Sequence, residues 1–363
     1  AKPGEYPIEL STCKGSVLHV SQTGDVLRRH YPNNNERIVI TPFRDETDNT
    51  VISSFRVLKE GVERGPDTFN LTEEQEDWAT EWAESEFNTA GSEWAPATTW
   101  EEMNAQSKFL AGKTDPLTGL DAYGIVDPLN YLWGGFGFYF LADRAAPYVK
   151  HPDSPAWLFD ADTMEPLVNN PGWVQAIQDV MDLLASDGAY PPDQINADPN
   201  TTAFQQFLAG TGGNVMWWGD VGSNARTSDT SLVGDVVGFD INPGTNKVYN
   251  NVSGEWEENL NVSPHNAYIG WGVYVTNRVS DDELKRKCTW SAAAHLGGKD
   301  LSLWTSAYPS GFQPDRNSLF NYDEWEAAGY DRAFVEDYLS SIADSYNHPN
   351  SANEPRIPGI FQY

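Results

Sequence analysis

The chain has 363 residues, and its 53 acidic and 23 basic side chains give a formal net charge of −30. This charge excludes nucleic acid as the main partner, because such binding needs a basic surface. The acidic residues are spread along the whole chain, so a solubilising surface on an exported or salt-exposed protein is the simplest explanation. No apolar run reaches the length of a membrane span, and Ala1 could follow a removed signal peptide.

The chain is rich in aromatic residues, with 14 Trp, 16 Tyr and 16 Phe. Indole and phenol rings offer flat apolar faces with a polar edge. Sugar rings present C–H patches on their faces and hydroxyl groups around the rim. We expect most of these aromatic rings to lie in the core, and the remainder to suit a carbohydrate site.

The N-terminal stretch GSVLHVSQTGDVLRRHYPNNNERIVITPF predicts a strand, a short helix and a second strand. Residues 17–20 and 38–40 are the apolar runs, and Gly24 and Asp25 open the helical piece between them. Strands that alternate with helices indicate a parallel α/β unit, whose ligands bind at the carboxyl ends of the strands. Residues 21–25 are therefore expected at the edge of a site.

Two helices carry clear start signals. In ATTWEEMNAQSKFLAG, Thr99 and Glu102 form a capping box. In NNPGWVQAIQDVMDLLASDG, Asn170 caps the helix and Pro171 occupies its first turn. The second helix also carries an apolar stripe, formed by Val174, Ile177, Met181 and Leu184.

The stretch TAFQQFLAGTGG predicts a short helix that ends at Gly210 and leads into VMWW, which we interpret as a buried strand. Successive side chains of a strand point to opposite faces, so Trp217 and Trp218 should face in opposite directions. One indole is expected to pack in the core and the other to face a ligand. The stretch AYIGWGVYVT predicts a second aromatic strand, and DRAFVEDYLSSIAD predicts a late helix.

The two cysteines, Cys13 and Cys288, are too few for a disulfide framework or a zinc cluster. Ser280 and Glu283 form a capping box before a helix that carries Cys288, which we expect to be a buried structural thiol. A single disulfide between the two cysteines remains open if the protein is exported.

Several catalytic signatures are absent from the sequence. AGKTDP lacks the first glycine of a phosphate-binding loop, and FDADTMEP lacks the glycine and the final glutamate of a calcium loop. The chain contains neither H-E-x-x-H nor G-x-S-x-G. We therefore expect no cofactor, no metal and no catalytic residues, although the abundant carboxylates leave a glycosidase pair open.

Aromatic and polar residues gather instead at four junctions between strands and loops. These are LNYLWGGFGFYF, WWGDVGSN, NAYIGWGVY and LWTSAYPSGFQPDR. With their order and spacing, the chain resembles the extracellular solute-binding proteins of carbohydrate ABC importers, the class that includes maltose-binding protein. The segments that carry the resemblance are FQQFLAGTGGNVMWWGDVGSN, GDVVGFDINPG, AYIGWGVYVTNRVSDDELKRKCTWSAAAHL and TSAYPSGFQPDRNSLF.

The resemblance implies an α/β, type II periplasmic-binding-protein fold. Its two lobes, each a mostly parallel sheet flanked by helices, hold the ligand in a cleft between them. Residues 1–97 and about 262–310 would form the first lobe, and residues 98–261 and about 311–363 the second. The implied ligand-binding residues are Gln22, Asp25, Tyr131, Trp133, Trp217, Trp218, Asp220, Asn224, Tyr268, Trp271, Trp304, Arg316, Gln362 and Tyr363.

The same resemblance implies that the protein would be a periplasmic monomer with its signal peptide removed. It would bind a sugar, oligosaccharide or polyol, deliver it to the membrane permease of an ABC importer and catalyse no reaction. Two alternatives stay open: a glycoside hydrolase that uses two of the carboxylates, and the same fold with a cationic small solute as its ligand.

Overall fold

The computed structural model describes five strands before residue 60 and most of the chain from residue 73 onward. The residues after 73 that it leaves undescribed are 93, 115–118, 131–135, 155, 161, 199, 268–271, 280, 309–311 and 354–363. The chain divides into two units, Ala1–Thr68 and Phe69–Tyr363. In the part of the chain that is described, no helix is both long enough and apolar enough to span a membrane.

The first unit contains antiparallel strands. β1 (Ile8–Ser11) pairs with β2 (Val17–Val20), and β4 (Glu36–Arg44) pairs with both β3 (Leu27–Arg28) and β5 (Thr50–Lys59). The prediction of a parallel strand–helix–strand unit here is therefore wrong, and β3 lies where the helical piece was expected. Short connections favour antiparallel pairing, because a parallel pair needs a crossover of about a dozen residues or more.

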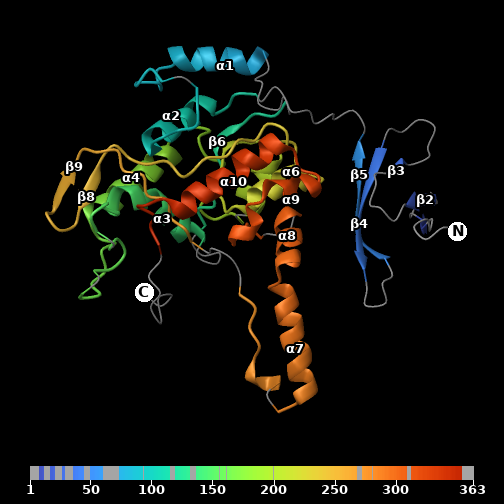
Figure 1. The fold of residues 1–363 in the computed structure, drawn as a ribbon. Helices are drawn as coiled ribbons and strands as arrows, with labels where there is room; N and C mark the ends of the chain where they lie inside the picture. The colour runs from blue at the N-terminus through green and yellow to red at the C-terminus, as the bar shows by residue number, and fades with distance from the viewer. Residues whose placement is uncertain are drawn as a thin grey trace. The chain divides into compact units, whose positions relative to one another are not determined.

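The second unit is mainly helical (Figure 1). Its helices are α1 (Glu73–Glu84), α2 (Trp100–Leu110), α3 (Phe136–Val149), α4 (Pro171–Leu184), α5 (Gln206–Leu208), α6 (Asp220–Thr227), α7 (Glu283–Leu296), α8 (Lys299–Ala307), α9 (Tyr322–Ala327) and α10 (Arg332–Asn347). A π-helical turn (Asn200–Gln205) precedes α5, and 3₁₀ turns lie at Asn277–Val279 and Asn317–Leu319. β6 (Tyr123–Ile125) and β7 (Gly212–Asn214) form a parallel pair, and β8 (Val248–Asn250) and β9 (Glu255–Glu257) an antiparallel one.

The predicted caps of α2 and α4 are confirmed. The Thr99 hydroxyl accepts a hydrogen bond from the amide of Glu102 at 3.2 Å, and the Glu102 carboxylate accepts one from the amide of Thr98 at 2.9 Å. The Asn170 side chain accepts from the amides of Gly172 and Trp173 at 2.9 and 3.1 Å. These bonds satisfy N–H groups that the first turn of a helix leaves free, and so they fix where each helix begins.

Replacing Asn170 with alanine should lower the free energy of unfolding by about 1 kcal/mol, because two amides of α4 lose their acceptor. Urea denaturation of the two proteins measures the difference. Asn170→Ser is the matched variant, since serine can still cap the helix, and it should recover most of the loss. Equal losses for both variants would contradict the capping role.

The apolar stripe of α4 lies on the exposed side of the helix. Val174, Ile177 and Met181 are 58%, 44% and 52% exposed. The buried side carries Gly172, Trp173, Ala176, Val180 and Leu183. This helix has apolar residues on both faces, and its packing partner α3 decides which face is covered.

Two aromatic clusters form most of the core of the second unit. In one, Trp325 of α9 is fully buried and contacts Tyr330 and Tyr338 edge-on, with ring centroids 5.0 and 5.6 Å apart. In the other, Trp157 and Trp173 stack with centroids 6.2 Å apart and join the buried face of α3. Most of the described aromatic rings are therefore used for packing, as the composition led us to expect.

The two predicted aromatic strands do not form within the described residues. Residues 215–218, which contain VMWW, have an irregular backbone after β7, and so do residues 272–276. Tyr274 is 87% exposed. The predicted helices around them are present, including α10, which covers the stretch DRAFVEDYLSSIAD.

Helix α7 extends away from the other helices of its unit (Figure 1). Its N-cap is Asp282, whose carboxylate accepts from the amide of Lys285 at 3.0 Å, so the prediction of a capping box from Ser280 is wrong. None of its residues is buried, and Cys288 is a free, exposed thiol rather than a buried one. Cys13 lies outside the described residues.

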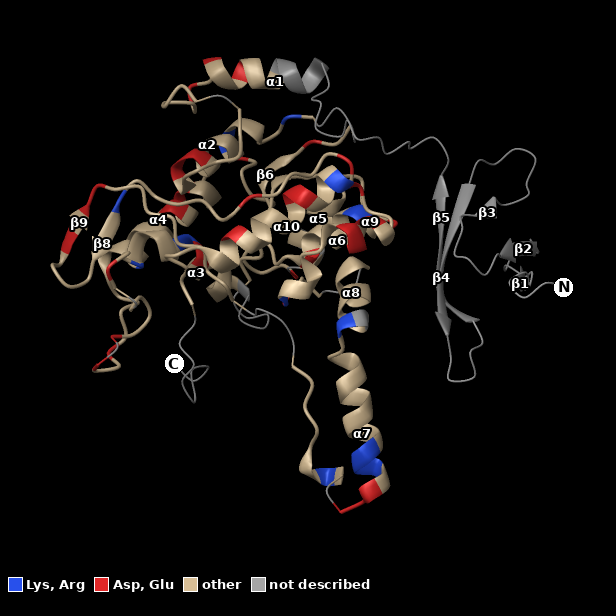
Figure 2. Ribbon diagram, viewed as in Figure 1, with Lys and Arg blue, Asp and Glu red and all other residues tan. Residues whose placement is uncertain are grey.

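The acidic residues are dispersed over the surface of the second unit (Figure 2). They lie on α1, α2, β9, α9 and α10 and are not concentrated at one place. This distribution agrees with a solubilising role, because a diffuse negative field does not mark a binding site.

Candidate functional site

The second unit contains a cavity of about 660 Å³. Its walls come from α2, β6, α3, β7, the irregular segment 215–219, residues 237–243, residues 265–267 and α10. Pockets that hold small molecules usually measure about 300–1,000 Å³. The cavity therefore has the size of a small-ligand site and lies where the parallel strands end, as is usual for α/β proteins.

Trp217 and Trp218 both line this cavity, and both are partly buried. The Trp217 ring packs against Phe204 with centroids 4.8 Å apart. The Trp218 ring meets Phe140 edge-on at 5.2 Å, and its indole N–H donates to the carbonyl of Ala267 at 3.1 Å. The two indoles are nearly perpendicular, at 83°, with centroids 5.6 Å apart. Each has one face on the core and contributes to the cavity wall, so a strict division into a core indole and a ligand indole is not observed.

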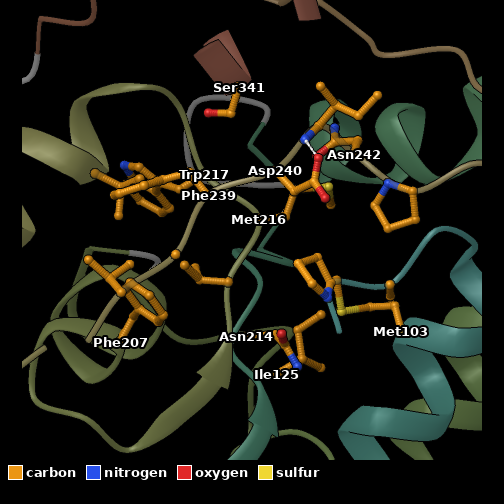
Figure 3. A pocket seen from close by; sticks show the side chains of 18 of the residues that line it. Met103, Ile125, Phe207, Asn214, Met216, Trp217, Phe239, Asp240, Asn242 and Ser341 are labelled. Carbon is orange, nitrogen blue, oxygen red and sulfur yellow. Dashed lines mark hydrogen bonds between the residues drawn. The ribbon is translucent and has the colours of Figure 1, made fainter. Parts of the chain in front are cut away.

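Polar side chains lie across the cavity from these rings. Figure 3 shows Phe207 and Trp217 on one side of the pocket, and Asp240 and Asn242 on the other. Asp240 is exposed, and one of its carboxylate oxygens accepts from the amide of Ile241 at 2.8 Å. The cavity thus combines aromatic surface with groups that can accept or donate hydrogen bonds.

A buried hydrogen-bonded pair, His265 and Asp143, forms another part of the wall. His265 Nδ1 lies 3.0 Å from a carboxylate oxygen of Asp143 on α3, and both residues are buried. Burial raises the pKa of the Asp143 carboxyl, and the hydrogen bond with His265 partly offsets the rise. Trp157 meets the imidazole edge-on at 5.0 Å. The pair fixes residues 265–267 against α3, on the side of the cavity where Trp218 binds Ala267.

Asp220 follows the tryptophan pair in the chain, after Gly219, and is the first residue of α6. Burial raises the pKa of its carboxyl to about 7, while bonds from its own amide and from the Trp217 indole oppose the rise. The Asp220 carboxyl therefore lies beside the Trp217 indole, and its neighbours Gly219 and Val221 line the cavity. Asn224 donates to the backbone carbonyl of Asp220 at 2.8 Å, inside α6.

Of the predicted site residues, Trp217 and Trp218 line the cavity. Asp220 and Asn224 lie next to them on α6 but are not among the residues that line it. Trp304 lies on α8, 41% exposed and beside Tyr308 with centroids 5.5 Å apart. Arg316 donates to the carbonyl of Gly297 at 3.0 Å. Neither Trp304 nor Arg316 is among the residues that line the cavity. The other predicted residues lie outside the described part of the chain, namely Gln22, Asp25, Tyr131, Trp133, Tyr268, Trp271, Gln362 and Tyr363.

Sequence reasoning missed several cavity residues. These are Tyr139, Phe140, Asp143, Asp240, Asn242 and His265. Asp240 and Asn242 follow a short apolar run in GDVVGFDINPG, which was the signal that the sequence offered, although residues 237–243 form no strand. The residues of α3 carried no such signal, because nothing in a helix sequence tells which buried polar group will meet a cavity.

No protein-family model matches the chain, and no curated protein does. Solved structures do match. An ABC-transporter solute-binding protein from Agrobacterium radiobacter K84, in complex with ribitol, is 18% identical with a TM-score of 0.52 over 75% of this chain and 57% of its own. The chain has the fold of an ABC-transporter solute-binding protein.

Two further solute-binding proteins match with similar identities, TM-scores and coverages. One, from Agrobacterium vitis S4 with bound D-mannitol, is 21% identical with a TM-score of 0.47 over 71% of this chain and 54% of its own. Maltose-bound MalE3 of T. maritima is 14% identical with a TM-score of 0.46 over 75% and 58%. The chain thus spans 54–58% of the length of these solved structures.

Proposed function

We propose that this protein captures a neutral sugar, oligosaccharide or polyol outside the cytoplasmic membrane and delivers it to the permease of an ABC importer. The observation that carries the proposal is the Trp217–Trp218 pair in the wall of a cavity of about 660 Å³ on this fold. Aromatic faces can stack on the C–H patches of a sugar ring, and the polar groups opposite can bind its hydroxyls. The solved structure in complex with ribitol supports this ligand class.

The two-lobed organisation is part of this proposal. Residues 1–97 and about 262–310 would form the first lobe, and residues 98–261 and about 311–363 the second. Helix α7 supports the assignment, because Leu284 and Trp290 are 73% and 59% exposed on a helix without a buried residue. We place this helix in the first lobe. We further propose that the protein acts as a periplasmic monomer.

The test is a titration of intrinsic tryptophan fluorescence with sugars, polyols, sugar acids and amines. We expect a saturable change with a neutral sugar or polyol. Trp218→Ala should weaken its binding about tenfold, equivalent to about 1.4 kcal/mol, because one aromatic face is lost. Trp290→Ala is the control, since this exposed indole lies on α7 and should leave the affinity unchanged.

A cationic solute is the second candidate, since the charged residues among the described lining include the carboxylates Asp143 and Asp240 but no Lys or Arg. Aromatic rings also attract cations. Salt distinguishes the two candidates, because binding of an amine should weaken as ionic strength rises while binding of a neutral sugar should not. Release of a product from any oligosaccharide would refute a pure transport role and support a glycoside hydrolase.

A further inference from the structure

The carboxylate of Asp127 is the centre of a buried polar network. Asp127 follows β6 and has no exposed surface. One of its oxygens accepts from the Tyr190 hydroxyl at 2.9 Å and from Arg144 Nη2 at 3.1 Å. The other accepts from the backbone amide of Met216 at 3.1 Å. Three segments that are distant in sequence therefore meet at a single carboxylate.

The network is tied in turn to the surrounding helices. Arg144 of α3 is 1% exposed, and its other terminal nitrogen donates to the side chain of Asn104 on α2 at 2.7 Å. Its guanidinium lies over the Trp100 ring, 4.4 Å from the centroid. A buried charge pair whose terminal nitrogens are bound in this way keeps a single geometry, because a shift would break these bonds inside the core.

The Met216 amide immediately precedes the two tryptophans. Residues 215–218 are irregular, so this backbone lacks the strand ladder that would otherwise fix it. The Trp218 indole is held from the other side by the carbonyl of Ala267. After the bond from the Val126 amide to the Asn214 carbonyl at 3.0 Å, the bond to Asp127 thus fixes the backbone directly before the Trp217–Trp218 pair to the segment that follows β6.

We propose that Asp127 is a positioning residue for the ligand site, whose carboxylate orients Trp217 and Trp218 through the amide of Met216. The effect of Asp127 on ligand affinity rests on the proposed function, whereas its effect on the orientation of the two indoles does not. The role requires a carboxylate, since all three partners are donors and an asparagine would present an NH₂ group to one of them. Sequence reasoning did not assign this residue.

The test compares Asp127→Asn with Asp235→Asn. Asp235 is the control because it also pairs with a buried arginine, Arg226, and is not among the residues that line the cavity. The readouts are the circular-dichroism exciton band of the two indoles, assigned by its loss in Trp218→Phe, and the sugar affinity from fluorescence. We expect Asp127→Asn to remove most of the exciton band and to weaken binding by about tenfold. Asp235→Asn should change neither.

If Asp127→Asn fails to fold, Tyr190→Phe provides the second variant, since it removes one hydrogen bond to the same carboxylate and keeps the ring. A partial loss of the exciton band in that variant would support the proposal. An unchanged band in the folded variants would overturn it and leave Asp127 a purely structural residue. If the wild-type protein binds no sugar but Asp127→Asn still loses the exciton band, the result would support the positioning role and refute the proposed function.

Discussion

Asparagine in place of Asp220 should stabilise the protein above neutral pH and leave its stability near pH 4 almost unchanged. Burial raises the pKa of the Asp220 carboxyl to about 7 from an ordinary value of 3.8. The folded protein therefore keeps a proton on this group at pH values where the unfolded chain has released it. The charged form is disfavoured in the fold because the group is only 9% exposed.

The sign of the effect follows from linkage. The stability that the protonated Asp220 contributes is complete below the unfolded pKa, and it is lost as the pH rises through the folded pKa near 7. A rise of about three pKa units corresponds to a free energy on the order of 4 kcal/mol. Above about pH 7 the native protein should be less stable than the variant by up to this amount.

Urea denaturation at pH 5, 6, 7 and 8 measures the difference between Asp220→Asn and the native protein. Asp160→Asn is the control, because backbone and side-chain hydrogen bonds from Thr163 lower the pKa of that exposed carboxyl. This variant should show no gain in stability above pH 7. A difference between Asp220→Asn and the native protein that does not grow with pH would show that Asp220 is not buried as the structure has it.

Alanine in place of Gly124 should destabilise the protein by about 3 kcal/mol or more. Gly124 is the central residue of β6, which packs directly on α2. A β-carbon at this position would lie 1.8 Å from the backbone oxygen of Ser107 and 2.4 Å from its backbone carbon. Because these atoms belong to the helix backbone at the fully buried Ser107, no side-chain rotation can relieve the overlap.

Denaturation midpoints and far-ultraviolet circular dichroism would measure this loss. Gly238→Ala is the matched control, since a β-carbon there meets only the Asp337 carboxylate at 3.9 Å, which is an ordinary contact. It should change the free energy of unfolding by no more than about 0.5 kcal/mol. Similar stabilities for the two alanine variants would mean that β6 and α2 are further apart than described.

Local signals in the sequence predicted helix boundaries well and burial poorly. The caps at Thr99 and Asn170 are confirmed, because a cap depends on residues within one turn of the helix. The stripe of Val174, Ile177 and Met181 is nevertheless exposed. A β-carbon on Gly172 would lie 2.5 Å from the Val149 side chain, so α4 approaches α3 on the face that carries this glycine. Close approach to a neighbour, rather than the number of apolar residues, selects the buried face.

In the candidate site, too, the sequence predicted the local motif but not the contacts between distant segments. The aromatic motif WWGDVGSN could be recognised in the sequence, and Trp217, Trp218 and Asp220 do lie together. Their expected alternation along a strand was wrong, because residues 215–218 leave the sheet after β7. The backbone there is set by the bond from the Met216 amide to Asp127, across 89 positions of sequence. No local pattern carries that information.

The sequence by itself determined the acidic composition, the starts of α2 and α4, the aromatic motifs and, through their order, the class of fold. These properties depend on composition and on residues within a few positions of each other. Only the tertiary structure decided which helix faces are buried, that Cys288 is exposed, and that Asp127, Asp143, Asp240 and His265 accompany the tryptophans. These depend on contacts between distant segments, where burial changes the free energy of a charge or an aromatic ring and so fixes its role.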